Sequence, residues 1–284
     1  MAWRLALTVT FGCGRIAFSR ELPGDASPDV CDPTAPFGEP QPIVELNDAA
    51  EQEGTLRLFP DELRGYYWSR RASNSHIRYV HRTAIGEPFE IEDVALASTG
   101  VHQVDPTFTS DGSMLVYRES GPGDQLYYAI RISEVSFDTP VAISTLNTAA
   151  TETQCFFAND GELYFSSGRS GGDDLYRSTR TGTTFSAPEL VNQLASPAAE
   201  GDPAIAPDQL SIYFRSQRAP SQAFDIWVAK RDTPTAAWGT PELVPNINSA
   251  VDDGPSWVSV DGCRLYMSSE RAGTNDVYVA TRGR

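Results

Sequence analysis

The feature that constrains this chain most is an internal repeat with a period of about fifty residues. Residues 253–282, DGPSWVSVDGCRLYMSSERAGTNDVYVATR, resemble residues 201–231, GDPAIAPDQLSIYFRSQRAPSQAFDIWVAKR. Five copies can be traced, and each has a proline three residues after an aromatic or apolar residue, in FGEP, IGEP, FDTP, FSAP and WGTP. These prolines are Pro40, Pro88, Pro140, Pro188 and Pro241. A period of this size is typical of the blades of a β-propeller.

Every copy carries four short runs of apolar residues separated by turn residues. One run follows the proline, a second leads to a turn around Asp, a third is aromatic and β-branched, and a fourth follows a Gly- or Ser-rich turn, as in PELVP, PSWVSVDG, RLYMSS and DVYVAT. The Asp-Gly pair is typical of hairpins, because glycine adopts a positive φ at little cost. The sequence therefore predicts an all-β protein, a five-bladed β-propeller with four-stranded blades over residues 37–284.

The repeat also resembles a known family. Its Asp-Pro and Asp-Gly pairs, followed by Leu-Tyr-Phe-x-Ser and Asp-Ile-Tyr patterns, are similar to the TolB-like and WD40-like propeller repeats of bacterial cell-envelope proteins. The resemblance covers residues 37–284 and is weakest in the first copy, where EGTLRLFPDELRGYYWSRR lacks the Asp-Gly pair. It implies a propeller that serves as a scaffold, a protein-binding domain or, in some members, an appendage of an enzyme.

The order of the runs predicts how the ring of blades closes. The run after each proline precedes the three better-marked runs, so the first copy begins with a strand that has no earlier blade, and the last copy ends one strand short. Residues 43–46 are therefore expected to complete the blade built from residues 255–281. Closure of this kind removes the free edges that would otherwise pair with other chains.

The first thirteen residues, MAWRLALTVTFGC, predict export. Arg4 provides a positive charge, an apolar stretch follows, and a small residue, Gly12, precedes Cys13, as in a short secretory signal peptide. The end of this segment is similar to the lipobox of bacterial lipoproteins, which implies lipidation of Cys13. Thr10 and Phe11 depart from the usual lipobox residues, so secretion without a lipid remains an alternative. The expected location is the periplasm, the outer membrane through a lipid anchor, or the exterior of the cell.

Composition limits the partners of the propeller. Residues 14–36 are rich in Pro, Asp, Ala and Ser and predict a flexible linker. The formal net charge of −16 repels phosphate backbones and anionic lipids, and no basic stripe compensates for it. Nucleic acid is thus excluded as a partner, and a membrane is expected only through the N-terminal lipid. We expect a monomer that binds a protein, peptide or glycan.

The cysteines leave their pairing open. The four residues are Cys13, Cys31, Cys155 and Cys263, without the spacing of a zinc site. If Cys13 is lipidated, Cys31 is left free; if it is not, a Cys13–Cys31 disulfide is the alternative in an oxidising compartment. Cys155 and Cys263 fall at non-equivalent positions of their copies and are expected to be small buried residues.

An acidic residue stands near the start of the second run in every copy. Because the second run lines the channel of a propeller, these carboxylates are expected to ring its mouth, and an Arg follows the third run in three copies, at Arg169, Arg218 and Arg271. One interpretation is a salt bridge repeated in each blade; the other is a cation site, since several oxygen ligands suit Ca²⁺ as a cofactor. The carboxylates are Glu53, Asp105, Glu152, Asp202 and Asp252 or Asp253.

The second copy departs from this pattern and predicts the binding site. Gly121 stands where the Arg of the later copies is expected, which would leave Asp105 unpaired, with His102 three residues before it. An unpaired carboxylate is a better ligand contact than a paired one, because no existing salt bridge has to break. We expect a site formed by residues 98–105 and 118–124 with a neighbouring apolar wall, and its ligand-binding residues are His102, Asp105, Arg118, Glu119 and Trp68.

Two functions follow from these features. The first is an extracytoplasmic scaffold that holds its ligand on the face of the channel carboxylates, without catalysis. The alternative is a glycoside hydrolase or lyase, since such enzymes use paired carboxylates at a channel mouth. An enzyme needs two unpaired carboxylates above an open pocket, whereas a scaffold pairs each carboxylate with an Arg.

Overall fold

The computed structural model describes residues 31–71, 74–97, 102–121 and 123–283. The predicted signal peptide with Cys13, and residues 14–30 of the predicted linker, lie outside the described residues. The same holds for residues 98–101 and 122 of the predicted binding loops. The described part of the chain contains no helix with the length and hydropathy needed to cross a bilayer.

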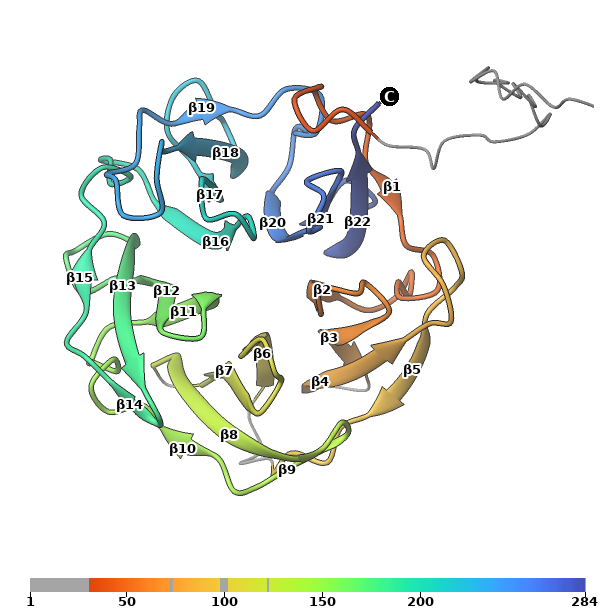
Figure 1. The fold of residues 1–284 in the computed structure, drawn as a ribbon, viewed down its shortest axis with the longest axis vertical. Coiled ribbons are helices and arrows are strands. Elements are labelled where there is room, and N and C mark those ends of the chain that lie inside the picture. The colour runs from red at the N-terminus through yellow and green to blue at the C-terminus, as the bar shows by residue number, and fades with distance from the viewer. Residues whose placement is uncertain (1–30, 72–73, 98–101, 122, 284) are drawn as a thin grey trace, which may run out of the picture. The chain divides into compact units, whose positions relative to one another are not determined.

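The described residues form five antiparallel sheets around a central axis, so the five-bladed propeller predicted from the repeats is confirmed (Figure 1). Blade 1 consists of β2 (Glu53–Leu58), β3 (Arg64–Arg71), β4 (Asn74–His81) and β5 (Glu90–Asp93). Blade 2 consists of β6 (His102–Phe108), β7 (Met114–Ser120), β8 (Gln125–Ser133) and β10 (Val141–Ala142), with β9 (Ser136–Phe137) beside β8. Blade 3 consists of β11 (Glu152–Asn159), β12 (Glu162–Ser167), β13 (Asp174–Thr181) and β15 (Glu189–Leu190), with β14 (Thr184–Phe185) beside β13. Blade 4 consists of β16 (Glu200–Ile205), β17 (Ser211–Ser216), β18 (Asp225–Lys230) and β19 (Glu242–Leu243). Blade 5 consists of β20 (Asp253–Val258), β21 (Arg264–Ser269), β22 (Asp276–Thr281) and β1 (Gln41–Pro42).

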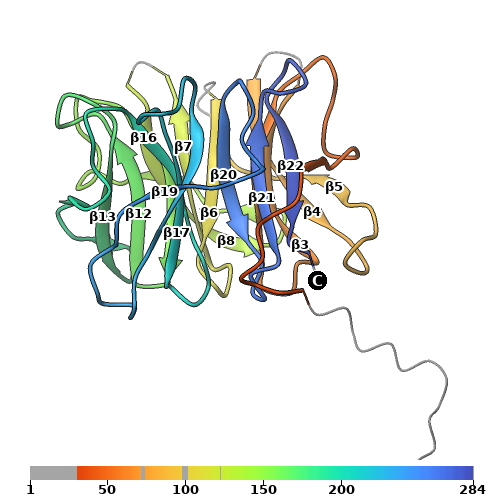
Figure 2. The ribbon, with the colours of Figure 1, turned by 90° about the horizontal axis from the view of Figure 1, so that it is seen from above.

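The first long strand of each blade lies innermost. β2, β6, β11, β16 and β20 contact one another around the ring and form the wall of the channel, as the second run of each copy was expected to do. The strands run between two faces that carry the loops (Figure 2). One face therefore gathers the starts of the inner strands, and the other gathers their ends.

The N-terminal strand closes the ring, as predicted, but two residues earlier than expected. Gln41 pairs with Val279 and Pro42 with Tyr278, and the Ile43 N–H donates to the carbonyl of Val277 at 3.0 Å. The strand thus covers the outer edge of β22, so the edge that the last copy leaves open is paired.

The turns after the inner strands explain why the repeat favours Asp-Gly there. Gly112 and Gly262 adopt φ values of 67° and 71°, and each preceding Asp accepts a hydrogen bond from the N–H two residues later. In the copies without glycine, Glu62 and Gln209 take the same left-handed conformation, with φ values of 58° and 61°. Blades 1 and 4 therefore have a side chain in this turn, where the glycine of blades 2 and 5 has none.

The core lies between neighbouring blades. Tyr66 of blade 1, for example, packs against Phe59 of its own blade and against Phe108 and Phe137 of blade 2. The aromatic residues that mark the repeats are also buried, namely Phe37, Phe137, Phe185 and Trp238. The second copy is the exception, because Ile85 is exposed and Phe89 is buried in its place, beneath the guanidinium of Arg82 at 4.3 Å.

The start of the described chain is fastened to the last blade, which corrects two expectations. Cys31 forms a disulfide with Cys263, so neither a free Cys31, nor a Cys13–Cys31 pair, nor an unpaired Cys263 is found. The Asp32 N–H donates to the carbonyl of Gly283 at 3.1 Å. Residues 31–36, assigned to the linker from their composition, are therefore attached to the propeller. Composition alone did not reveal this, because the partners lie at the far end of the sequence. Cys155 is free and buried, as expected.

Candidate functional site

Carboxylates begin the inner strands of four of the five described blades. Each lies opposite a serine of the next strand, and the pairs are Glu53–Ser69, Glu152–Ser167, Glu200–Ser216 and Asp253–Ser269. In blade 2 the pair is Gln103–Glu119, so the carboxylate stands on the other strand. Glu200 was not among the carboxylates predicted from the sequence. Asp105 and Asp202, which were, lie two residues further along their strands, and Asp252 lies just before β20.

This first tier of carboxylates holds the loops of the blades together. Glu152 accepts hydrogen bonds from the Thr148 N–H and hydroxyl at 2.8 and 2.6 Å, and Arg169 lies 3.3 Å away. Arg218 pairs with Glu200 at 3.0 Å and Arg271 with Asp253 at 2.9 Å in the same way. In blades 3, 4 and 5, the Arg that follows the third run of the repeat therefore forms a salt bridge with the first-tier carboxylate, as the interpretation of a repeated salt bridge predicts.

Glu53 differs from its counterparts. Its Oε2 accepts from the Asp48 N–H at 3.1 Å, but its buried Oε1 has no hydrogen-bond partner, and no ion pair reaches Glu53 within the described residues. Burial raises the pKa of Glu53 to about 7, and the nearby charges of Asp276 and Asp48 add to this rise. Within the described residues, a carboxylate without an ion pair thus stands at the junction of blades 1 and 5.

A second tier lies two residues further along the inner strands and faces the channel. Thr55, Asp105, Gln154 and Asp202 adopt φ values of 50°, 55°, 47° and 47°, at points where a bulge shifts the register between the inner strand and its neighbour. Non-glycine residues seldom adopt this conformation, and it is found mainly where a functional or packing constraint holds it. Four polar side chains are therefore fixed at the channel mouth.

The two aspartates of the second tier are each paired with an arginine of the adjacent strand. Arg118 donates to Asp105 at 2.8 Å and to Asp124 at 3.0 Å, and Arg215 lies 3.3 Å from Asp202. The expectation that Asp105 is unpaired is therefore wrong. The sequence holds one signal of these pairs: the two copies with Asp-Pro in the inner strand both have Arg at the same position of the following strand, where the other copies have Trp68, Ser166 and Ser268.

Burial raises the pKa of Asp202, and the negative charge of Asp105 raises it further, whereas Arg215 lowers it. The carboxylate of blade 2 thus adds to the effect of burial on the pKa of Asp202 in blade 4.

Glycines beside the second tier give its side chains room. A Cβ atom on Gly254 would lie 2.3 Å from Oδ2 of Asp202, and one on Gly201 would lie 2.7 Å from Oε1 of Gln154. At Gly54 a Cβ atom would meet the ring of Trp68 at 2.9 Å. Trp68 also donates from Nε1 to the Thr55 hydroxyl at 3.3 Å, so its ring is held against the mouth.

A cavity of about 460 Å³ occupies this mouth. Its size falls in the range of small-molecule sites. Carboxylates, amides, hydroxyls, two guanidinium groups and a single tryptophan line it; the lining includes Thr55, Trp68, Asp105, Arg118, Gln154, Asp202, Arg215, Asp252 and Asn275.

The structure brings together three of the five residues predicted for ligand binding, namely Trp68, Asp105 and Arg118. His102 is not part of the cavity lining, and its Nδ1 accepts a hydrogen bond from the Ser75 N–H at 2.9 Å. Glu119 is also outside the lining, because neighbouring residues of a strand point to opposite faces; it is buried and accepts from the Tyr117 hydroxyl at 3.2 Å.

The carboxylates considered as cation ligands do not gather into a site. Among the described residues, no group of three or more His, Cys, Asp or Glu side chains is placed to hold a metal ion. Glu53 and Glu152 accept from backbone N–H groups of the loops that precede their strands, and Asp105 and Asp202 face Arg118 and Arg215. Asp252 accepts from the Phe224 N–H at 3.0 Å.

No protein-family model and no curated protein matches this chain. Among solved structures, it is similar to a putative glycoside hydrolase from Parabacteroides distasonis, with a TM-score of 0.58 and 12% identity over 92% of this chain and 95% of the other. An α-L-arabinofuranosidase from Podospora anserina in complex with cellotriose has a TM-score of 0.52 and 11% identity over 89% and 98% of the two chains. A putative TolB from Agrobacterium tumefaciens is also similar, with a TM-score of 0.49 and 14% identity over 80% and 73%.

The chain is a five-bladed β-propeller with a polar cavity at one end of its channel. At 11–12% identity, the likeness to the two glycoside hydrolases shows the fold alone. A fold does not determine a function, so the side chains at the channel mouth have to carry the functional argument.

Proposed function

We propose that the propeller is a non-catalytic binding scaffold that holds an uncharged glycan in the cavity at the channel mouth. The observation that carries the proposal is the pairing of both second-tier carboxylates, Asp105 with Arg118 and Asp202 with Arg215. A scaffold needs such pairs for rigidity, whereas a glycosidase needs one carboxylate free to move a proton and another free to act as base or nucleophile.

The composition of the lining supports a sugar as ligand. Planar amide, carboxylate and guanidinium groups can each accept or donate to sugar hydroxyls, and the Trp68 ring offers an apolar face at one side. Acidic residues outnumber Arg118 and Arg215 in the lining, which disfavours sugars that carry carboxylates or sulfates.

Binding can be tested with xylotriose and cellotriose, the ligands present in structures of similar propellers. Isothermal titration should detect binding by the full chain, and Trp68→Ala should weaken it about tenfold or more, since loss of a stacked aromatic removes its contact area. Ile132→Ala, at a residue that is 71% exposed, is the matched control and should bind as the parent does. Retention of full affinity by Trp68→Ala would exclude this mouth as the sugar site.

A second function, glycoside hydrolysis, has one observation in its favour. Asp202 and Asp105 face the same cavity, and burial raises the pKa of Asp202, as a general acid requires. The two functions separate in one assay with an aryl α-L-arabinofuranoside. A scaffold releases no phenol above the level of an Asp202→Asn variant. Turnover by the parent that Asp202→Asn abolishes would establish the enzyme instead.

We also propose that the chain is exported. The Cys31–Cys263 disulfide supports this, because such bonds persist in oxidising compartments and are rare in the cytosol. Attachment through a lipid on Cys13 is the finer form of this proposal and is tested below.

A further inference from the structure

A second cavity, of about 310 Å³, lies at the opposite end of the channel and differs in chemistry from the first. The ends of the inner strands and the turns after them form it, whereas the starts of these strands form the polar mouth. Its walls are mainly aromatic and aliphatic and include Leu58, Phe108, Phe156, Phe157, Ile205 and Trp257. We call it the apolar funnel.

One charged side chain contributes to the funnel from the channel interior. Arg57 occupies the fifth position of β2 and pairs with Tyr66 of β3. In the other blades, the inner-strand residues that pair with the equivalent position of the second strand are Thr107, Phe156, Ala204 and Trp257. Arg57 is therefore the one cation in this tier of the described channel wall. Its signal in the sequence is an Arg among the apolar residues of EGTLRLF, which departs from the repeat.

The Arg57 side chain is 2% exposed and incompletely bonded. Its Nη1 donates to the carbonyl of Cys155, and its guanidinium lies 4.7 Å from the centre of the Phe156 ring. Its Nε is buried and has no hydrogen-bond partner among the described residues. Burial lowers the pKa of Arg57 to about 10, so the group still carries its charge at neutral pH.

The polar groups at the rim of the funnel already have partners. Ser110 donates from its N–H and its hydroxyl to Asp160 at 2.6 and 2.7 Å, and Asn159 donates to Gln209 at 3.0 Å. The unsatisfied donor in the funnel is therefore Nε of Arg57, at the buried end of the cavity. A buried donor without a partner is costly, and a bound acceptor would remove that cost.

We propose that the apolar funnel binds a small aryl or alkyl carboxylate, with its apolar body against Phe156, Phe157 and Trp257 and its carboxylate toward Arg57. The walls exclude water from the apolar body of the ligand, and a carboxylate offers the planar, charged acceptor that a guanidinium binds best. A free carboxylic acid and the C-terminus of a peptide that ends in an aromatic residue present the same chemistry.

The test compares phenylacetate with phenylacetamide, which has the same shape without the charge. Titration calorimetry on the full chain should show phenylacetate binding about tenfold or more tightly, as charge-assisted hydrogen bonds to a buried guanidinium imply. Arg57→Met should reduce the two affinities to the same value. A short peptide ending in Phe, measured against its C-terminal amide, distinguishes the peptide source from the free acid, and preference for either acid over its amide supports the site.

A pair of variants at Val260 keeps the proposal testable if Arg57→Met fails to fold. Val260 lines the rim and is 57% exposed, so Val260→Glu and Val260→Lys should fold normally. Val260→Glu should weaken phenylacetate binding several-fold relative to Val260→Lys, while phenylacetamide should bind both within about twofold. Equal affinities for the acid and the amide, no binding of either at millimolar concentration, or no difference between the two Val260 variants would overturn the proposal.

Discussion

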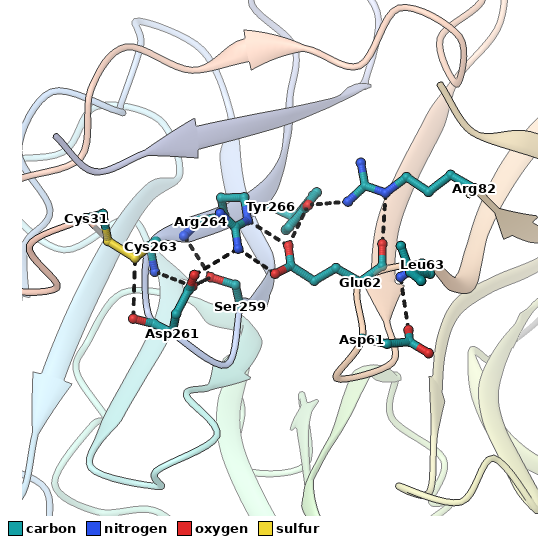
Figure 3. A network of polar contacts seen from close by, with 10 residues as sticks. All are labelled: Cys31, Asp61, Glu62, Leu63, Arg82, Ser259, Asp261, Cys263, Arg264 and Tyr266. Carbon is teal, nitrogen blue, oxygen red and sulfur yellow. Dashed lines mark hydrogen bonds and ion pairs between the residues drawn. A yellow bond between two sulfur atoms is a disulfide. The ribbon is translucent and has the colours of Figure 1, made fainter. Parts of the chain in front are cut away.

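Arg264 donates two hydrogen bonds, of 2.7 and 2.6 Å, to the carboxylate of Glu62, and they join the last blade to the first (Figure 3). The Tyr266 hydroxyl donates to the same carboxylate at 3.0 Å, and Arg264 also pairs with Asp261 of its own hairpin at 3.0 Å. Glu62 reaches them from the left-handed turn position that glycine occupies in blades 2 and 5 and Gln209 in blade 4. A residue that departs from the repeat thus fastens the junction at which the ring closes.

Removal of Glu62 should therefore destabilise the ring strongly. In Glu62→Ala the partly buried guanidinium of Arg264 loses its main partner, and we expect the free energy of unfolding to fall by about 2 kcal/mol. Glu189→Ala is the control, because Glu189 pairs with Arg177 at the surface and is 70% exposed. Urea denaturation should show a small effect for the control. Equal losses for both variants would mean that the Glu62–Arg264 pair does not hold the junction.

Deletion of residues 37–47 should open the propeller. The deletion removes β1, which pairs with β22, and leaves the outer edge of blade 5 unpaired. We expect aggregation or loss of cooperative unfolding, measured by size-exclusion chromatography and thermal melting. A soluble monomer that melts within a few degrees of the full chain would show that closure by β1 is dispensable.

Reduction of the Cys31–Cys263 disulfide should lower stability. The bond joins residues separated by 232 positions in the sequence, and loop-closure entropy for a loop of that size gives an upper value of about 5 kcal/mol. Cys263→Ser should unfold at a lower urea concentration than the parent, and the parent in reducing agent should match it. The variant itself should not respond to reducing agent, which provides the control. If reductant left the parent's midpoint unchanged while the bond was shown to be open, the disulfide would have no stabilising role.

The stability of the propeller should depend on the protonation of Glu53. Its pKa in the folded protein is raised to about 7 from 4.5, so the folded state holds a proton that the unfolded state releases between these values. Stability attributable to this group is therefore fully present below pH 4.5, falls as the pH rises toward 7, and stays low above it. Glu53→Gln should remove this dependence and be more stable than the parent at pH 8.

The matched control for Glu53→Gln is Glu152→Gln, which disrupts the ion pair with Arg169. It should be less stable than the parent at pH 8, opposite in sign to Glu53→Gln. Melting temperatures of the parent and both variants at pH 5 and pH 8 check the prediction. A loss of stability at pH 8 for Glu53→Gln would contradict the raised pKa.

Replacement of Cys13 by Ser tests the lipid anchor. If Cys13 is lipidated, the parent should fractionate with membranes and Cys13→Ser should not, because the residue that carries the lipid is gone. A parent that is processed but soluble, like the variant, would leave secretion without a lipid. An unprocessed protein in the cytoplasm would contradict export altogether.

The sequence by itself determined the fold. Five copies of one pattern, with turn residues at the same places, fix the number of blades, and the missing strand of the last copy requires the N-terminal strand to close the ring. These features are local: each strand and turn is encoded by residues that are neighbours in the chain, so their repetition can be read without knowing how distant parts meet.

Only the tertiary structure decided which polar side chains meet at the channel. The bulge in each inner strand turns Asp105 and Asp202 toward Arg118 and Arg215, whereas counting positions along the strand placed Asp105 among the first-tier carboxylates and left it unpaired. Ring closure brings Cys31 to Cys263 and Glu62 to Arg264 across separations of 232 and 202 residues. Such contacts depend on the register of whole sheets and on the geometry of the closed ring, and local patterns of residues do not encode either.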